Sequence, residues 1–187
     1  MKIEVQRTRR LLDDFFKIDE VFLRFEKFDG TMSGPIRRLV LDRGDAVAAI
    51  IRNRATGRLV FARQLRYPTH ANGPGWLTEI IAGLVDAGEQ PEAAIRREIA
   101  EESGYDVATI EHISTFYTTP GGSNERVFLY HAEVDGSRKT QFASASDEED
   151  IELRELDLDA ALRAVTAGDI VDAKTILALY WLKSRAP

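Results

Sequence analysis

The sequence predicts an α/β fold in which a mixed β-sheet lies between layers of helices. Segments rich in β-forming residues fill most of the first half of the 187-residue chain, a charged helix follows them, and two more helices close the chain. No internal repeat or low-complexity segment interrupts this order. A chain of this length is expected to form one domain, or one domain with an additional arm.

The predicted strands are separated by turn residues. Asp29-Gly30 is a tight-turn signal, and Ala55-Thr56-Gly57 turns the chain between the two strands of a hairpin. Residues 68–75 contain two Gly and two Pro and are expected to form a loop. The predicted strands span residues 16–25, 37–41, 46–52, 58–66, 76–81, 110–117, 125–134 and 151–156.

The central helix has both a start signal and a stop signal. Pro91 suits the first helical position, because the N–H that proline lacks would have no partner there. Gly104 is suited to a left-handed C-cap. The helix is therefore predicted over residues 91–103, and the two closing helices over 158–167 and 172–184.

Composition argues against several classes of function. The net charge is −6 and no basic stripe is present, which argues against nucleic-acid binding. Cysteine is absent, which excludes disulfides, a thiolate nucleophile and a zinc–thiolate site. No apolar run approaches the roughly 18 residues of a membrane span, and the N-terminus lacks the apolar region of a signal peptide. A cytoplasmic location away from membranes is therefore expected.

Three glutamates of the central helix are predicted to lie together on one flank. At about 100° per residue, Ile95 and Ile99 form an apolar stripe. Glu98 and Glu102 lie beside this stripe one turn apart, and Glu101 lies next to them. Carboxylates this close repel one another, so a cation is expected among them, and oxygen ligands favour Mg²⁺ or Mn²⁺ over zinc. The alternative is a solvated, salt-bridged helix face.

The stretch 83–105 resembles the Nudix box, G-x5-E-x7-R-E-U-x-E-E-x-G-U, where U is a bulky apolar residue. It departs only at the last position, where Tyr105 replaces the usual aliphatic residue. The resemblance implies a Nudix-type α-β-α sandwich and a hydrolase that cleaves a diphosphate linked to another moiety. The identities that match are Gly83, Glu89, Arg97, Glu98, Glu101, Glu102 and Gly104. The metal ligands that the resemblance implies, for Mg²⁺ or alternatively Mn²⁺, are Glu98, Glu101, Glu102 and the backbone carbonyl of Ala82.

Outside the box the chain is similar to the ADP-ribose pyrophosphatase and GDP-mannose hydrolase branch of this family. The similarity extends from about residue 15 to 184. The individual motifs are weak, but they occur in the order and at the spacing of that branch. These motifs are Phe15-Phe16-Lys17-Ile18-Asp19, the run 37–45, Gln64-Leu65-Arg66, the loop 119–126 and Glu148-Glu149-Asp150-Ile151.

The branch implies an N-terminal β arm, residues 1–45, that is swapped between the subunits of a homodimer, followed by the Nudix hydrolase domain, residues 46–187. Phe15 of the partner subunit and Arg66 are then expected to hold the base of the substrate. Arg38 and Glu125 are expected to contact its phosphate and ribose. The alternatives are a core position for Phe15 and simple surface charges for the other three residues.

The acidic stretch before residue 151 is expected to complete the catalytic machinery. By resemblance, Glu149 is a catalytic metal ligand and Asp147 lies where the general base is usually Glu. Because Asp is shorter, Glu148 is an alternative base. Without the resemblance, the same stretch would indicate a solvated acidic loop.

The leading functional prediction is Mg²⁺-dependent hydrolysis of a nucleoside diphosphate sugar, with ADP-ribose yielding AMP and ribose 5-phosphate. Glu102 is expected to be essential for catalysis as a metal ligand. Hydrolysis of GDP-mannose or another sugar nucleotide is the alternative within the same chemistry. A sensor that binds ADP-ribose without cleaving it is the alternative of another class, although the complete box favours an enzyme.

Overall fold

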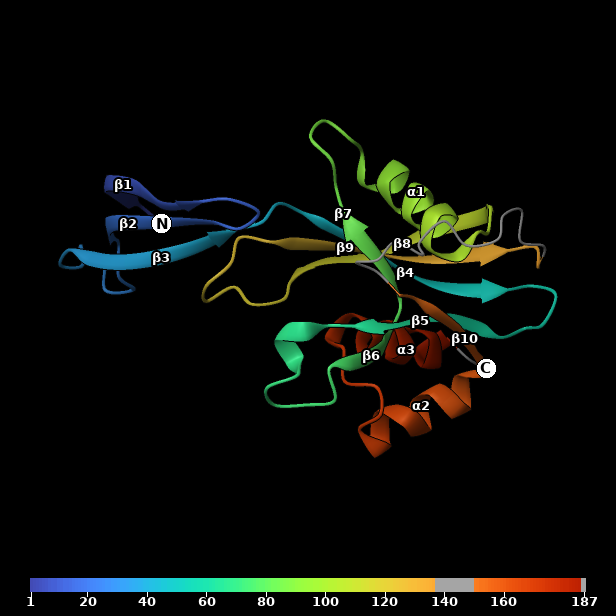
Figure 1. Cartoon of the computed structure of the whole chain (residues 1–187). Helices are drawn as coiled ribbons and strands as arrows, with labels where there is room; N and C mark the ends of the chain where they lie inside the picture. The colour runs from blue at the N-terminus through green and yellow to red at the C-terminus, as the bar shows by residue number, and fades with distance from the viewer. Residues whose placement is uncertain (137–149, 186–187) are drawn as a thin grey trace. The chain divides into compact units, whose positions relative to one another are not determined.

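The computed structural model describes residues 1–136 and 150–185 and forms two compact units (Figure 1). Unit 1 comprises Met1–Asp45 and Phe116–Arg126, and unit 2 comprises Ala46–Thr115 and Val127–Pro187. Each unit has its own sheet, and the two are described separately below.

Unit 1 contains a three-stranded antiparallel sheet in the order β1-β2-β3, built from β1 (Ile3–Asp13), β2 (Lys17–Phe25) and β3 (Ile36–Asp42). The sequence patterns did not predict β1, whose side chains are mostly polar or charged and are exposed. Cross-strand ion pairs to β2 stabilise it instead. Arg9 lies 3.0 Å from Glu20, and Nε of Arg10 donates to Asp19 at 2.6 Å.

Unit 1 has almost no apolar core of its own. Every residue of this unit is described, and the buried ones are all polar: Glu20, Ser33, Ser123 and Glu125. Large apolar side chains of the arm remain exposed, including Ile3, Val5, Leu11, Leu12, Phe15, Phe16 and Leu39. A three-stranded sheet with this much exposed apolar surface is typical of an element that packs against a partner.

Unit 2 is organised around a seven-stranded mixed sheet, which confirms the predicted fold class. The main path runs β10-β5-β4-β9-β8, with β6 paired to β5 and β7 paired to β4. Strands β4 and β9 are parallel, whereas β4 and β5 are antiparallel. One strand was predicted over residues 76–81, but the segment 76–84 forms two short strands with different partners. The bounds are β4 (Ala46–Asn53), β5 (Leu59–Leu65), β6 (Trp76–Glu79), β7 (Ile81–Leu84), β8 (Val107–Tyr117), β9 (Arg126–Val134) and β10 (Glu152–Leu156).

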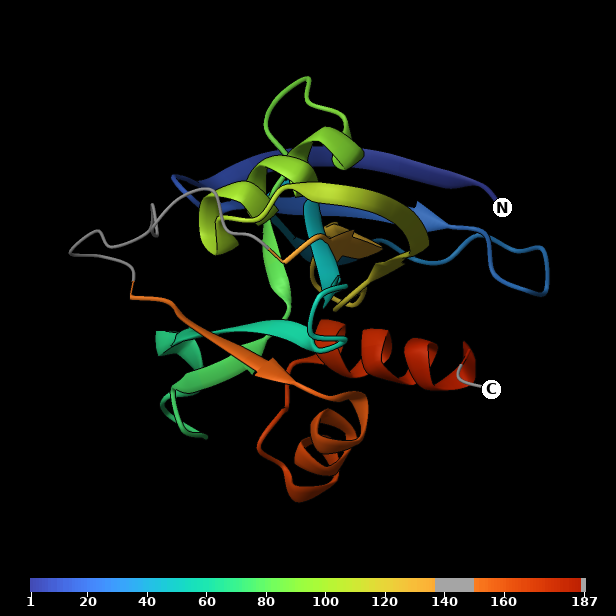
Figure 2. The same cartoon turned by 90° about the vertical axis from the view of Figure 1, so that its right-hand side faces the viewer.

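Helices cover both faces of this sheet, as Figures 1 and 2 show. Helix α1 (Pro91–Ser103) packs on one face, and α2 (Leu158–Ala167) and α3 (Ala173–Arg185) lie on the other. Strand β4 is buried on both faces. Alternate residues of this strand, including Val47 and Ile51, join the core cluster that contains Ile95 and Ile99 of α1. Residues between them, such as Ile50, point to the opposite face, because successive side chains of a strand alternate.

The ends of α1 agree with the sequence signals. Pro91 occupies the first turn, and Gly104 has a φ of 70° and donates its N–H to the carbonyl of Ala100.

A short 3-10 helix, η1 (Tyr67–Thr69), lies in the loop between β5 and β6. No helix of the described residues is both long enough and apolar enough to span a membrane.

Candidate active site

The carboxyl group of Glu98 on α1 packs directly against Gly83 on β7. A Cβ placed on Gly83 would lie 2.0 Å from the carboxyl carbon of Glu98 and 2.1 Å from its Oε1. Only glycine leaves room for the carboxylate at this point of the strand. Burial raises the pKa of Glu98, although the neighbouring Arg97 opposes this effect. The glycine at this box position therefore has a steric reason in this chain.

Arg97 is the cation that organises the box. Its Nη1 donates to Glu98 at 2.7 Å and to Glu101 at 3.3 Å, and its Nη2 donates to Glu89 at 3.0 Å. The same Nη2 donates to the backbone carbonyl of Leu84 at 3.2 Å, which ties the helix to β7. The hydrogen bonds from Arg97 lower the pKa of Glu89. Glu89 thus anchors the arginine.

The three box glutamates differ in their environments. Glu98 is 13% exposed and Glu101 is 56% exposed. Glu102 lies one helical turn from Glu98, and its Oε2 is buried. The predicted apolar stripe with Glu98 and Glu102 on its flank is therefore present, whereas Glu101 points to solvent beside Arg97.

The residues present fit a hard divalent cation. The donors are carboxylate oxygens, and the close approach of Glu98 to Gly83 brings one of them beside the strand that carries Ala82. Within residues 1–136 and 150–185, no group of three or more His, Asp or Glu side chains is already gathered around one point. The remaining predicted residues of the metal and base sites, Asp147, Glu148 and Glu149, lie outside the described residues.

Arg66 extends from the end of β5 and is not an isolated surface charge. Its Nε donates to Oε1 of Glu79 at 2.6 Å, and Glu79 is only 2% exposed. Burial alone would lower the pKa of Arg66, but Glu79, with contributions from Glu102 and Asp172, raises it overall. Glu102 of the box thus contributes to the electrostatic environment of Arg66.

The three predicted substrate contacts of unit 1 have different surroundings. Phe15 is 67% exposed and packs edge-to-face on Phe16, so the alternative of a core phenylalanine is wrong for this chain. Arg38 is exposed and donates to a neighbouring backbone carbonyl. Glu125 is buried, accepts from Thr118 at 3.1 Å and forms an ion pair with Arg43 at 3.1 Å, so it is not an exposed edge charge.

The charged residues behind Arg66 were not predicted from the sequence. Glu79 is buried in β6, and Lys174 and Asp172 lie at the start of α3. A signal for Glu79 was available, because it interrupts the apolar stretch 76–82 of a predicted core strand. No comparable signal marks Lys174, since a lysine in the first turn of a helix is ordinary.

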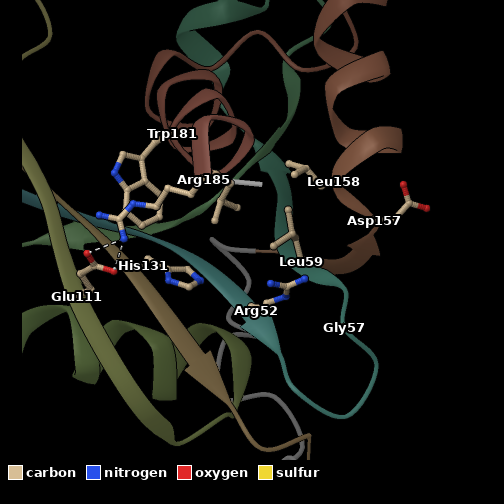
Figure 3. Close-up of a pocket in the computed structure, with 10 residues that line it drawn as sticks. Arg52, Gly57, Leu59, Glu111, His131, Asp157, Leu158, Trp181 and Arg185 are labelled. Atoms are coloured by element: carbon tan, nitrogen blue, oxygen red, sulfur yellow. Dashed lines mark hydrogen bonds and ion pairs between the residues drawn. The ribbon is translucent and has the colours of Figure 1, made fainter. Parts of the chain in front are cut away.

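A separate cavity of about 440 Å³ lies on the face of the sheet that α2 and α3 cover (Figure 3). His131 and Trp181 line it, with ring centroids 5.6 Å apart. Arg185 stacks on Trp181 at 4.3 Å and pairs with Glu111 at 3.0 Å. The box glutamates do not line this cavity, which is therefore distinct from the candidate active site.

The cavity gives a testable pH dependence of stability. Nε2 of His131 is buried and has no hydrogen-bond partner among the described residues, and burial lowers the pKa of His131. Above about pH 6.5 the histidine is neutral in both the folded and the unfolded chain, so its burial does not reduce the free energy of unfolding. Below that pH the unfolded chain takes up the proton first, so the free energy of unfolding decreases as the pH falls from about 6.5 through the lowered pKa of His131. We expect the Tm of His131→Leu to fall less between pH 7 and pH 5 than that of the wild type.

The control for this pH measurement is His112→Leu, which removes an exposed histidine that contacts Thr115. This variant should follow the wild-type dependence of Tm on pH. Equal slopes for His131→Leu and the wild type would contradict the assignment of acid sensitivity to His131.

The fold and the box together define a Nudix hydrolase. A family model described as the NUDIX domain matches residues 42–179, and the chain belongs to this family. Curated relatives named GDP-mannose pyrophosphatase match almost the whole chain. The protein from Pectobacterium atrosepticum is 36% identical over 179 residues, covering 95% of this chain and 92% of the relative. That from Cronobacter sakazakii is 35% identical over 187 residues, covering 99% and 97%.

A solved structure described as an ADP compounds hydrolase has the same fold. It superimposes with a TM-score of 0.76 and covers 100% of this chain and 97% of its own, at 18% sequence identity. This similarity supports the α-β-α architecture and leaves the choice of substrate to other observations.

Proposed function

We propose that this Nudix hydrolase cleaves the diphosphate bond of a nucleoside diphosphate sugar with Mg²⁺, for which Mn²⁺ can substitute. The observation that carries the proposal is the arrangement of Glu98 against Gly83, with Arg97 behind it and Glu102 one turn away. The bound cation would neutralise the diphosphate and polarise its phosphorus.

The chain's own residues have distinct proposed roles in this reaction. Glu98, Glu101 and Glu102, with the carbonyl of Ala82, hold the cation, and Arg97 keeps Glu98 in place. Arg66 contacts the substrate through the guanidinium nitrogens that Glu79 does not use. The proposed ligand Glu149, and Asp147 or Glu148 as the base for the attacking water, lie outside the described residues.

Two substrates are proposed, each from a different observation. The order of the sequence motifs around Phe15, Arg66 and residues 119–126 supports ADP-ribose, with AMP and ribose 5-phosphate as products. The names of the curated relatives, at 35–37% identity over nearly the full chain, support GDP-mannose.

A substrate panel with and without Mg²⁺ tests the proposal. We expect turnover of ADP-ribose or GDP-mannose that EDTA abolishes and that added Mg²⁺ restores. The assay follows nucleoside monophosphate and sugar phosphate by chromatography, since both products are phosphate esters. Binding of a nucleotide sugar without turnover of any panel member would favour the non-catalytic sensor.

We further propose that residues 1–45 are a swapped arm of a homodimer. The support lies in unit 1, where exposed apolar side chains of β1 include Val5, Leu11 and Leu12, while the buried residues of the unit are polar. A second copy of the chain would cover this apolar surface. Sedimentation of the full chain is expected to give the mass of two chains.

Phe15→Ala is expected to raise KM for the nucleotide sugar about tenfold with little change in kcat. The reason is that an exposed aromatic ring, supplied by the partner's arm, would lose its contact with the base in both ground and transition states. Steady-state kinetics with the preferred panel substrate measure both constants.

The matched control for the arm is Phe28→Ala, since Phe28 is a fully exposed phenylalanine at a turn of the same unit. It should leave KM unchanged. A sedimentation mass of one chain, or a wild-type KM for Phe15→Ala, would contradict the swapped-arm proposal.

A further inference from the structure

A network of four charged side chains lies behind the candidate active site in unit 2. Oε1 of Glu79 accepts from Nε of Arg66 at 2.6 Å, and Oε2 of Glu79 lies 3.5 Å from Nζ of Lys174. Lys174 in turn lies 2.7 Å from Oδ1 of Asp172. Two cations and two anions alternate, so the network is neutral as a whole. Glu79 is its most deeply buried member, at 2% exposure.

The network is anchored at its Asp172 end, at the start of α3. Asp172 accepts from the backbone N–H of Thr175 at 2.9 Å and from its hydroxyl at 2.7 Å, which fixes the start of α3. The N–H of Ile80 donates to the same hydroxyl at 2.9 Å. Burial alone would raise the pKa of Asp172, but Lys174 and Thr175 lower it overall, so the residue remains an anion. These contacts hold Glu79 and its strand against α3.

The contact with Glu79 leaves one side of the Arg66 guanidinium available. Nε is used for the bond to Glu79, and the guanidinium of Arg66 donates no other hydrogen bond to a described residue. Its two Nη nitrogens are therefore open to a ligand, and the side chain is 40% exposed. A guanidinium held at Nε presents its Nη nitrogens in a fixed plane, whereas a free arginine must lose rotamer entropy when it binds.

We infer that Glu79 is a positioning residue for substrate binding: through its ion pair with Arg66, backed by Lys174 and Asp172, it fixes the plane in which Arg66 meets the nucleotide sugar. This inference rests on the proposed contact between Arg66 and the substrate. Glu79 itself does not touch the reacting atoms. Its effect is on KM, because the orientation of Arg66 matters equally in the ground state and the transition state.

A double-mutant cycle on the full-length enzyme tests the inference. The four proteins are the wild type, Glu79→Gln, Arg66→Ala and the double variant, each measured for KM and kcat with the preferred panel substrate. We expect Glu79→Gln to raise KM about tenfold in the wild-type background. In the Arg66→Ala background it should change KM less than twofold, because the group that it positions is gone.

The cycle separates the possible failures. Equal effects of Glu79→Gln in both backgrounds would overturn the positioning role while leaving Arg66 as a substrate contact. A wild-type KM for Arg66→Ala would overturn both the contact and the positioning. Failure of the wild type to turn over any nucleotide sugar would instead refute the proposed function itself.

Two additional proteins keep the test independent of folding. Glu152→Gln makes the same substitution on β10, which pairs with β5. It breaks exposed contacts to Arg63 at 3.4 Å and to Arg154 at 3.0 Å, and it should leave KM unchanged. If circular dichroism shows that Glu79→Gln does not fold, Arg66→Lys is measured instead. This variant keeps the positive charge and the Glu79 carboxylate but lacks the planar guanidinium. A KM raised as far as in Arg66→Ala supports the inference, and a wild-type KM for Arg66→Lys overturns it.

Discussion

Replacement of Glu102 by Gln is expected to lower kcat by at least about 100-fold while the fold is retained. Glu102 lies on the flank of α1 one turn from Glu98, with its Oε2 buried, and contributes to the field at Arg66. The amide has nearly the shape of the carboxylate but no negative charge, so a cation loses one of its ligands. Steady-state kinetics across a Mg²⁺ titration measure the effect, which should include a higher Mg²⁺ concentration for half-maximal rate.

The fold of the Glu102 variant should survive because α1 is held by other contacts. Ile95 and Ile99 are fully buried in the core cluster, and Arg97 binds β7 through the carbonyl of Leu84. The matched control is Glu92→Gln on the same helix, which breaks only an exposed pair with Arg96. A near-wild-type kcat for Glu102→Gln would refute the assignment of Glu102 as a metal ligand.

Gly83→Ala is expected to reduce kcat/KM about 100-fold with a small change in Tm. The added Cβ would lie 2.0 Å from the carboxyl carbon of Glu98, so one of the two groups must move. The carboxyl is the far end of a flexible side chain, and it moves more easily than the paired strand β7. A displacement of about 1 Å at a catalytic group costs roughly this factor in rate.

Gly34→Ala is the control for this substitution, since nothing lies within 4 Å of a Cβ at that position. It should keep wild-type kinetics. Thermal unfolding distinguishes a displaced carboxylate from a disrupted strand, because strain in β7 would lower the Tm substantially. A Gly83→Ala enzyme with unchanged kcat/KM would show that the position of Glu98 is not critical.

Much of the fold was predictable because its signals are local. Pro91 and Gly104 mark the ends of α1, and the structure places the helix over the predicted residues 91–103. The predicted helix 158–167 is also present with the same bounds. Such signals depend on the backbone preferences of single residues, which act in any tertiary context.

The strands that were mispredicted depend on distant partners. Strand β1 lacks a regular apolar alternation, and it is held as a strand by pairing with β2 and by ion pairs to Glu20 and Asp19. The segment 76–84 divides into β6 and β7 because it changes its pairing partner from β5 to β4. Strand propensity depends strongly on such context, and a single sequence does not contain it.

The sequence by itself determined the chemistry of this protein. Glu98 and Glu102 are four residues apart, so helical geometry places their two carboxylates one turn apart beside an apolar stripe. Only the tertiary structure decided how these groups are held, because the contacts join residues far apart in the chain. Glu98 meets the bare backbone of Gly83 on β7, and Arg66 meets a buried Glu79 whose strand is tied through Ile80 to Thr175, 95 positions away. Because these contacts are buried, they hold the side chains of Glu98 and Arg66 in fixed orientations. Burial arises only when the chain folds, so the sequence alone does not show it.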